Sequence, residues 1–194
     1  MKSGKYQAVV IGVSAGGIAV LDKILPALPS DFSPAVMIVQ HMAAGGGSYL
    51  VERYSSIASL PVREAADKEP IQEGTIYFAP ADYHLLVESD KTLALSAEAK
   101  VNYSRPAIDL LFETAAEAYC RKLIGIILTG ANADGAAGLS RVKELGGTAI
   151  VQSPATAEVE IMPLAAIHAT TVDYIAPPEE MGALLVSLVR YEEE

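Results

Sequence analysis

The sequence predicts an α/β fold: a doubly wound, mainly parallel sheet flanked by helices, with an antiparallel hairpin insertion. Two observations support this prediction. Short continuous apolar runs rich in Val and Ile recur along the chain, as in strands that are buried on both faces of a sheet. Between most of these runs, apolar residues recur at helical spacing. Buried strands that alternate with amphipathic helices are typical of a parallel sheet with helical crossovers.

In the first third of the chain, strands are expected at Ala8–Val13, Ala35–Gln40 and Val62–Ala65. A helix is expected over Ile18–Leu25, because its apolar residues lie at helical spacing and prolines follow it. A glycine-rich loop, Gly45-Gly46-Gly47, leads into a second expected helix.

The middle of the chain changes character. Gly74–Ser96 contains short β-rich runs separated by turn residues, which predicts the hairpin insertion. A helix is then expected to begin near Ser104, with Ser104 as its N-cap and Pro106 in its first turn. Its apolar face continues to Tyr119, and Asp109 is expected to point away from that face.

The last third repeats the alternation. Apolar runs predict strands at Leu123–Leu128, Thr148–Gln152 and Val172–Ala176. The helix that follows the first of these strands is expected to end at Gly146. A final amphipathic helix precedes a solvated acidic tail, Glu192–Glu194.

The composition limits what the chain can be. Its 194 residues are 51% hydrophobic, which fits a single domain over residues 1–194 with a sizeable core. The formal net charge of −10 disfavours binding to nucleic acid. The apolar runs are too short for stable insertion into a membrane, and the single cysteine, Cys120, fits the cytoplasm. Neither a metal nor a cofactor is expected, since no cysteine pair and no cluster of carboxylates with histidine has ligand spacing.

Three loops follow expected buried strands, and each carries one member of a Ser/His/Asp set. Ser14 follows the first strand, His41 follows the second, and Asp134 lies in the loop after Leu123–Leu128. Ligands of such sheets bind beyond the carboxyl ends of the strands, near a switch in strand order. The three side chains are therefore expected to meet at one edge of the sheet.

The turn at Ser14 suits a nucleophile. A serine hydroxyl needs an adjacent base, which His41 would supply, oriented by Asp134. The backbone amides of Ala15 and Gly16 would lie at a helix N-terminus, where partial positive charge favours an oxyanion.

Other interpretations compete with this one. Gly12–Gly17 matches a dinucleotide-binding fingerprint only with serine at the second glycine, and no acidic residue ends the next strand. Gly12–Gly16 matches a G-x-S-x-G elbow, but the chain order of Ser, His and Asp departs from that of α/β-hydrolases. Asp134 is also a candidate N-cap for the next helix, a role that is compatible with orienting His41. Of the other histidines, His84 is expected to be structural or at the surface, and His168 to lie near a helix C-terminus.

Several motifs occur in order over nearly the whole chain. They are I-G-V-S-A-G-G at Ile11–Gly17, V-Q-H-M at Val39–Met42, G-T-I-Y-F-A-P-A-D-Y-H at Gly74–His84, S-R-P-A-I-D-L-L-F at Ser104–Phe112 and L-T-G-A-N-A-D-G-A-A-G-L at Leu128–Leu139. This set resembles the catalytic domain of the chemotaxis protein-glutamate methylesterase family (CheB). The resemblance implies a doubly wound sheet with an antiparallel hairpin. It also implies hydrolysis of glutamate methyl esters on the cytoplasmic region of a receptor or signalling protein, often with deamidation of glutamine.

The resemblance maps the serine, histidine and aspartate of the family onto Ser14, His41 and Asp134, the residues that the strand ends also select. The backbone at Gly130 and Ala131 is expected to help hold the oxyanion.

Two departures from the family pattern motivate an alternative. Many family members carry a receiver domain, whereas this chain begins directly at the esterase-like segment and is expected to be a stand-alone form. The family loop T-G-M-G-x-D-G reads T-G-A-N-A-D-G here, with Ala131 and Asn132 at the changed positions. The alternative is a catalytically weak regulatory binding module of the same fold. The oligomeric state stays open.

Overall fold

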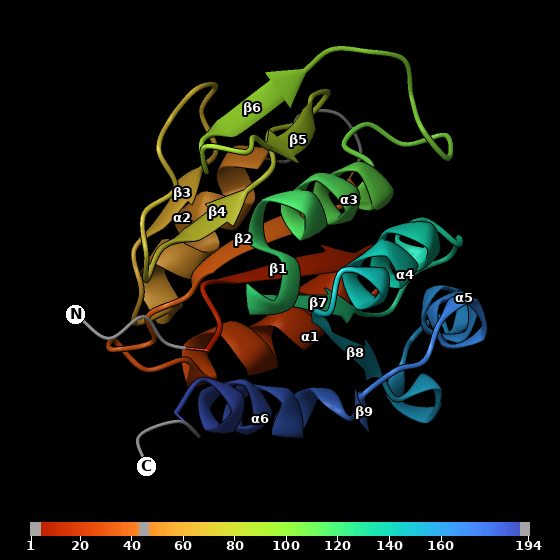
Figure 1. Ribbon diagram of the computed structural model, residues 1–194. Coiled ribbons are helices and arrows are strands. Elements are labelled where there is room, and N and C mark those ends of the chain that lie inside the picture. Colours follow the sequence, from red (N-terminus) through yellow and green to blue (C-terminus); the bar gives the residue numbers. More distant parts are fainter. Residues whose placement is uncertain (1–4, 43–46, 191–194) are drawn as a thin grey trace.

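The structure, a computed structural model, describes residues 5–42 and 47–190. Within these residues the main sheet has seven strands: β1 (Ala8–Val13), β2 (Ala35–Gln40), β3 (Val62–Glu64), β4 (Ile76–Phe78), β7 (Leu123–Ile127), β8 (Thr148–Gln152) and β9 (Tyr174–Ala176). They are all parallel and lie in the order β3-β4-β2-β1-β7-β8-β9 (Figure 1). The chain winds from β1 towards β3 and then from β7 towards β9, so the predicted doubly wound sheet is confirmed.

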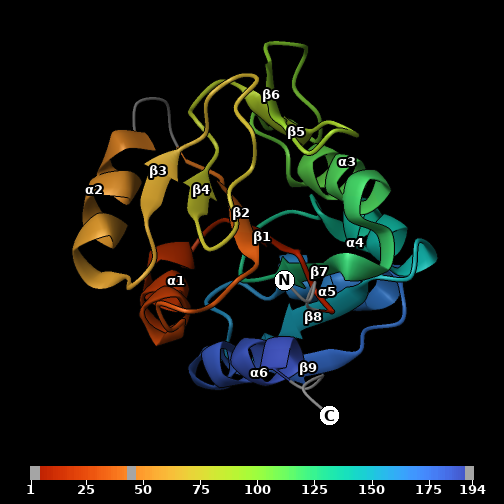
Figure 2. The same ribbon diagram turned by 60° about the vertical axis from the view of Figure 1, so that its left-hand side comes forward.

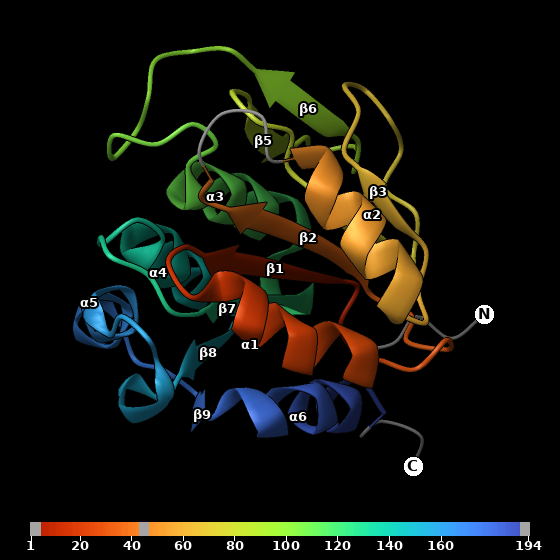
Figure 3. The ribbon, with the colours of Figure 1, turned by 180° about the vertical axis from the view of Figure 1, so that it is seen from behind.

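Helices cover both faces of this sheet and make a three-layer molecule. Figure 3 shows the face covered by α1 (Gly17–Ile24), α2 (Gly47–Ile57) and α6 (Pro178–Arg190). The opposite face is covered by α3 (Ile108–Tyr119), α4 (Ala136–Glu144) and α5 (Ile161–Ala169). Among the described helices, none is long and apolar enough to cross a membrane.

Each face of the sheet has its own apolar cluster, because successive side chains of a strand point to opposite faces. On β1, Val9 and Ile11 belong to the cluster under α1, α2 and α6, and Ala8 and Val10 belong to the cluster under α3, α4 and α5. All four side chains are fully buried, which explains why the sequence of β1 is a continuous apolar run rather than an alternating one.

The hairpin is shorter than the predicted insertion. It consists of β5 (His84–Val87) and β6 (Leu93–Ser96), which pair antiparallel outside the main sheet, above α3 (Figure 2). The first part of the predicted insertion, Ile76–Phe78, is instead β4 and pairs parallel with β2 and β3. A strand of three buried residues has too little periodicity to separate it from a hairpin arm by sequence.

The start of α3 also differs from the prediction. The helix begins at Ile108 and has no side-chain cap from the residues before it, so Ser104 and Pro106 precede the helix. Its cap comes instead from Asp134, whose carboxylate accepts hydrogen bonds from the amides of Ile108 (2.7 Å) and Asp109 (3.0 Å). A cap supplied from a distant loop leaves no local signal in the sequence.

Two expected segments fall largely outside the described residues. Of the loop Gly45-Gly46-Gly47 the structure describes only the last residue, as the start of α2, and the tail Glu192–Glu194 lies beyond residue 190.

Candidate active site

Ser14 lies in the turn between β1 and α1, at the carboxyl edge of the sheet. The backbone fixes this turn: the Ser14 amide donates to the Thr129 carbonyl (2.9 Å), and the Ser14 carbonyl accepts from the Gly17 amide (3.0 Å) and from Nε2 of Gln40 (2.9 Å). Gly16 has a backbone φ of +78°, a conformation that residues with a Cβ rarely adopt. Ser14 lines an open cleft at this edge.

His41 follows β2 and lines the same cleft as Ser14. Its amide donates to the Val13 carbonyl (2.9 Å), which holds His41 beside the end of β1. Its Nε2 lies 2.8 Å from Oδ2 of Asp134, in the loop after β7. An ionised carboxylate can only accept hydrogen bonds, so Nε2 carries the proton and Nδ1 of the neutral imidazole is left able to accept one. The strand ends thus bring the three predicted residues together, two of them in direct contact.

The carboxylate of Asp134 is fully buried and receives four hydrogen bonds. The donors besides His41 are the amides of Ile108 and Asp109 and the side-chain amide of Asn102 (2.9 Å). Burial raises the pKa of Asp134, but these hydrogen bonds outweigh burial and hold the pKa below its usual value. Asp134 is therefore ionised at neutral pH, as a carboxylate that orients an imidazole must be.

A second buried carboxylate, Asp109 on α3, mirrors Asp134. Asp109 accepts hydrogen bonds from the amides of Gly135 (2.9 Å) and Gly138 (2.7 Å), so it caps α4 while Asp134 caps α3. Nδ2 of Asn102 joins the two carboxylates, 2.8 Å from Asp109 and 2.9 Å from Asp134. Burial raises the pKa of Asp109, and the charge of Asp134 adds to this shift. Two predictions are therefore wrong: Asp134 does not cap the helix that follows it, and Asp109 does not point to solvent.

The backbone amides predicted to hold an oxyanion differ in availability. Among the described residues, the amides of Ala15 and Gly16 have no hydrogen-bond acceptor. The Gly130 amide donates to the Val159 carbonyl (3.1 Å), so it is already in use, and Ala131 is exposed. Ala15 and Gly16, at the start of α1, are the better-placed pair of donors.

The altered loop before α4 keeps its shape through a side chain. Oδ1 of Asn132 accepts a hydrogen bond from the Asp134 amide (3.0 Å), an Asx-type turn that fixes the backbone at Asp134.

The cleft has a volume of about 550 Å³. Ile18 and Met42 give it an apolar part, and both side chains are partly exposed. Its two acidic residues differ in their surroundings. Asp22 forms two hydrogen bonds with Arg53 (2.5 and 3.0 Å), whereas Glu158 has no ion pair or hydrogen-bonded side-chain partner among the described residues.

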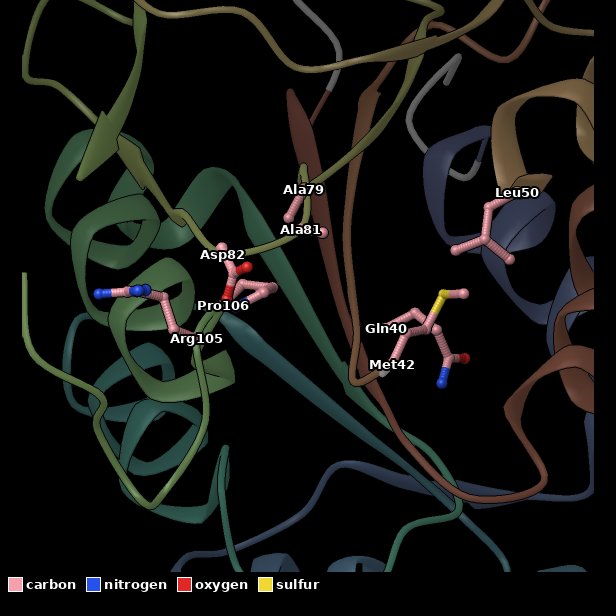
Figure 4. A pocket seen from close by; sticks show the side chains of 8 residues that line it. All are labelled: Gln40, Met42, Leu50, Ala79, Ala81, Asp82, Arg105 and Pro106. Carbon is pink, nitrogen blue, oxygen red and sulfur yellow. The ribbon is translucent and has the colours of Figure 1, made fainter. Parts of the chain in front are cut away.

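A smaller cavity of about 30 Å³ borders the cleft. Figure 4 shows the residues that line it. Asp82, Arg105 and Pro106 lie on one side, and Gln40, Met42 and Leu50 lie on the other. Ala79 and Ala81 lie between these two groups. This volume holds one or two water molecules at most, so the larger cleft is the place for a substrate side chain.

The other two histidines lie apart from this site. His84 is fully buried, where its Nδ1 accepts from the Ala107 amide (3.1 Å) and its Nε2 donates to the Ala99 carbonyl (2.9 Å), a structural role. His168 is exposed in the last turn of α5. Within residues 5–42 and 47–190, no group of three or more His, Cys, Asp or Glu side chains could hold a metal ion.

Sequence reasoning missed two polar residues around the site, Asn102 and Glu158. It also missed that the side chain of Asp109 is buried. Asn102 and Glu158 lie in irregular loops, where no periodicity marks them. Asp109 falls within the motif S-R-P-A-I-D-L-L-F, and an acidic residue in the first turn of an otherwise apolar helix was the available signal.

A family model described as CheB methylesterase matches residues 9–185. The chain belongs to the CheB methylesterase family. A protein of Leptospira interrogans, provisionally named protein-glutamate methylesterase/protein-glutamine glutaminase, is 50% identical over 183 residues, which cover 94% of this chain and 95% of that protein. A Thermotoga maritima protein with the same name is 40% identical over 190 residues, which cover 96% of this chain and 55% of that protein.

A solved CheB structure also matches this chain in its fold. The crystal structure of the Thermotoga maritima CheB methylesterase catalytic domain has a TM-score of 0.91 and 39% identity, and the match covers 95% of this chain and 99% of that domain. The chain therefore spans a CheB catalytic domain, about half the length of the Thermotoga protein and nearly all of the Leptospira protein. The predicted family and its fold are confirmed.

Proposed function

We propose that this CheB-family chain is a serine hydrolase that removes methyl esters from glutamate side chains of a signalling protein. The observation that carries the proposal is the hydrogen bond between His41 and an ionised Asp134, at the cleft that Ser14 lines. The names of the relatives, protein-glutamate methylesterase, supply the substrate class.

In the proposed reaction, Nδ1 of His41 accepts the hydroxyl proton of Ser14 as the serine oxygen attacks the ester carbonyl. The amides of Ala15 and Gly16 hold the oxyanion of the tetrahedral intermediate. Methanol leaves with the proton from His41. Water then attacks the acyl-enzyme, again with His41 as base, and releases the glutamate carboxylate. Asp134 keeps the imidazole in the required tautomer and stabilises its charged form.

The same steps hydrolyse the side-chain amide of glutamine, with ammonia leaving in place of methanol. The names of the relatives include protein-glutamine glutaminase, which supports this second substrate. The family is associated with methylated chemoreceptors, so the partner in this proposal is the methylated cytoplasmic region of such a receptor or a related signalling protein, and the site of action is the cytoplasm.

The variant Ser14→Ala tests the proposal directly. Methanol release from a methylated receptor peptide is expected to fall on the order of 10³-fold or more, because the nucleophile is lost. Ser55→Ala, at an exposed position on α2, is the matched control and should keep the wild-type rate. Hydrolysis by Ser14→Ala at the control rate would refute the proposal.

The alternatives receive less support. A binding module without turnover is not favoured by relatives that are named as enzymes, and labelling of Ser14 by a fluorophosphonate probe would count further against it. Nucleotide binding at Gly12–Gly17 is disfavoured by the carboxylate of Glu158 beside Gly16, where it would repel a pyrophosphate.

A further inference from the structure

Arg105 is a cation in the lining of the small cavity that borders the cleft. Gln40 and Met42 line both the cavity and the cleft, so the two spaces adjoin. Asp82 lies on the same side of the cavity as Arg105 (Figure 4). Among the described residues, however, Arg105 forms no ion pair with any carboxylate, Asp82 included. The positive charge of Arg105 is therefore available to a ligand.

The guanidinium of Arg105 has one nitrogen in use and one edge without a partner. Nη1 donates to the carbonyls of Ala97 (2.9 Å) and Glu98 (3.0 Å), which fixes the orientation of the group. Nε is buried and has no acceptor among the described residues, while the residue as a whole is partly exposed. Nε and Nη2 form the edge of a guanidinium that binds both oxygens of a carboxylate. Because a buried N–H without an acceptor costs free energy, a carboxylate that supplies one is favoured there.

The backbone that follows Arg105 is fixed to the candidate triad. The amide of Ile108, at the start of α3, donates to Oδ2 of Asp134 (2.7 Å), and the same oxygen lies 2.8 Å from Nε2 of His41. The segment that carries the guanidinium and the loop that carries the imidazole are therefore held by one carboxylate. A binding subsite needs this kind of fixed geometry relative to the reacting groups.

Arg105 and Glu158, the unpaired carboxylate of the cleft, lie on opposite sides of Ser14. Arg105 lines its cavity together with Ala79, which follows β4, whereas Glu158 follows β8. Ser14 follows β1, which lies between β4 and β8 in the sheet. A carboxylate on the substrate is attracted on the side of Arg105 and repelled on the side of Glu158, so these charges favour one placement of an acidic substrate segment.

We infer that Arg105 is a specificity-determining residue that binds a carboxylate on the substrate protein close to the methylated glutamate. This inference rests on the proposed function. Figure 4 shows the guanidinium extending away from Gln40 and Met42, and the cavity holds only one or two water molecules. The carboxylate at Arg105 therefore belongs to a neighbouring residue of the substrate, and not to the residue whose ester reacts in the cleft.

The test compares pairs of methylated peptides in which one residue near the methyl-glutamate is either glutamate or methionine. The residue is placed in turn at each position within about four residues of the methyl-glutamate, or one helical turn. Methionine is uncharged and similar in length and, unlike glutamine, is not a candidate for deamidation. At one position or more, kcat/KM of the wild-type protein is expected to be about tenfold higher for the glutamate peptide, the range of a hydrogen bond to a charged group.

Arg105→Gln should bring this ratio of the two kcat/KM values close to one. The variant also loses the hydrogen bonds to Ala97 and Glu98, but a disturbance of that loop lowers kcat/KM for both peptides equally and leaves the ratio unchanged. Arg105→Lys keeps the charge without the paired donors, so it should keep only part of the preference. Asp82→Asn removes the carboxylate on the same side of the cavity and should increase the preference.

Lys100→Gln is the matched control, since Lys100 is an exposed cation on the same loop and does not line the cavity. It should keep the wild-type ratio, and thermal unfolding of each variant shows that the fold is kept. No preference for glutamate at any position in the wild-type protein, or a preference that survives in Arg105→Gln, would overturn the inference.

The same peptides separate this inference from the proposed function. If wild-type protein hydrolyses none of the peptides, the proposed function fails, and binding to the Ser14→Ala form then decides the inference. Tighter binding of a glutamate peptide than of its methionine partner, lost in the double variant Ser14→Ala/Arg105→Gln, would support the role of Arg105. Equal binding of both peptides at every position would contradict it.

Discussion

Asn102 shows how much of the candidate site depends on one residue outside the triad. Its side-chain amide donates to two buried carboxylates, those of Asp109 and Asp134. Two carboxylates this close together would otherwise tend to share a proton, which would weaken the partner of His41. We therefore expect Asn102 to be a positioning residue, which acts on the proposed reaction through Asp134.

The variant Asn102→Asp tests this role. It replaces a donor by an acceptor at similar volume, and aspartate tolerates the φ of +51° at this position. The new carboxylate would lie beside His41, Asp109 and Asp134, and Glu113 on α3 interacts electrostatically with both aspartates. Because these carboxylates repel one another, the carboxyl group at position 102 should retain a proton to higher pH. We expect kcat to fall about tenfold or more with little change in KM, and the acidic limb of the pH–rate profile to move to higher pH.

The neighbouring variant Tyr103→Phe provides the control for Asn102→Asp. Tyr103 is 98% exposed on the same loop, so its kinetics and pH profile should match those of the wild-type protein. An unchanged profile in Asn102→Asp as well would show that Asn102 does not position the triad.

At the scale of elements, α3 and α4 exchange their N-terminal caps. Asp134 from the start of α4 caps α3, and Asp109 from α3 caps α4. Because each helix supplies the acceptor for the other, the packing of the two helices and the position of the Asp134 carboxylate are set by the same hydrogen bonds.

Asp109→Ala should therefore destabilise the whole fold. The variant leaves the amides of Gly135 and Gly138 without their acceptor at a buried helix end, and we expect the free energy of unfolding to fall by about 2–3 kcal/mol. Urea denaturation measures this difference. Glu52→Ala, exposed on α2, should change the free energy of unfolding by less than about 0.5 kcal/mol. Equal stability of the two variants would contradict the role of the exchanged caps.

These elements also show what the sequence could predict. The long buried strands β1, β2 and β7 were predicted because a continuous apolar run between amphipathic helices is typical of a strand that is buried on both faces. The residues Ser14, His41 and Asp134 followed from the same strands, since parallel strands end at one edge. The caps of α3 and α4 could not be predicted, because each depends on a residue more than twenty positions away that only tertiary packing brings near.

At the scale of the whole molecule, Asp134 and Asp109 have opposite effects on how the free energy of unfolding depends on pH. The pKa of Asp134 is lowered by folding, so its contribution is present above the unfolded value of about 3.9 and is lost as the pH falls through the folded pKa. The pKa of Asp109 is raised by folding, so the ionised carboxylate lowers the free energy of unfolding. This destabilisation is complete above the folded pKa of Asp109 and absent below its unfolded pKa.

Asp109→Asn removes the opposing contribution. The variant should therefore lose more stability than the wild-type protein between pH 7 and about pH 3. Urea denaturation at the two pH values gives the difference for each protein. A smaller loss in the variant than in the wild-type protein would show that the sign for Asp109 is wrong.

In the proposed function Asp134 both orients His41 and caps α3, and these two roles limit how the fold can lose its chemistry over evolutionary time. A lineage that abandons hydrolysis can change Ser14, in a turn held by backbone hydrogen bonds, with little effect on folding. A change at Asp134 removes the acceptor at the start of α3 as well, so selection for a folded protein protects it. Inactive descendants are expected to keep this aspartate long after the serine has gone, and its retention alone is a poor sign of an active enzyme.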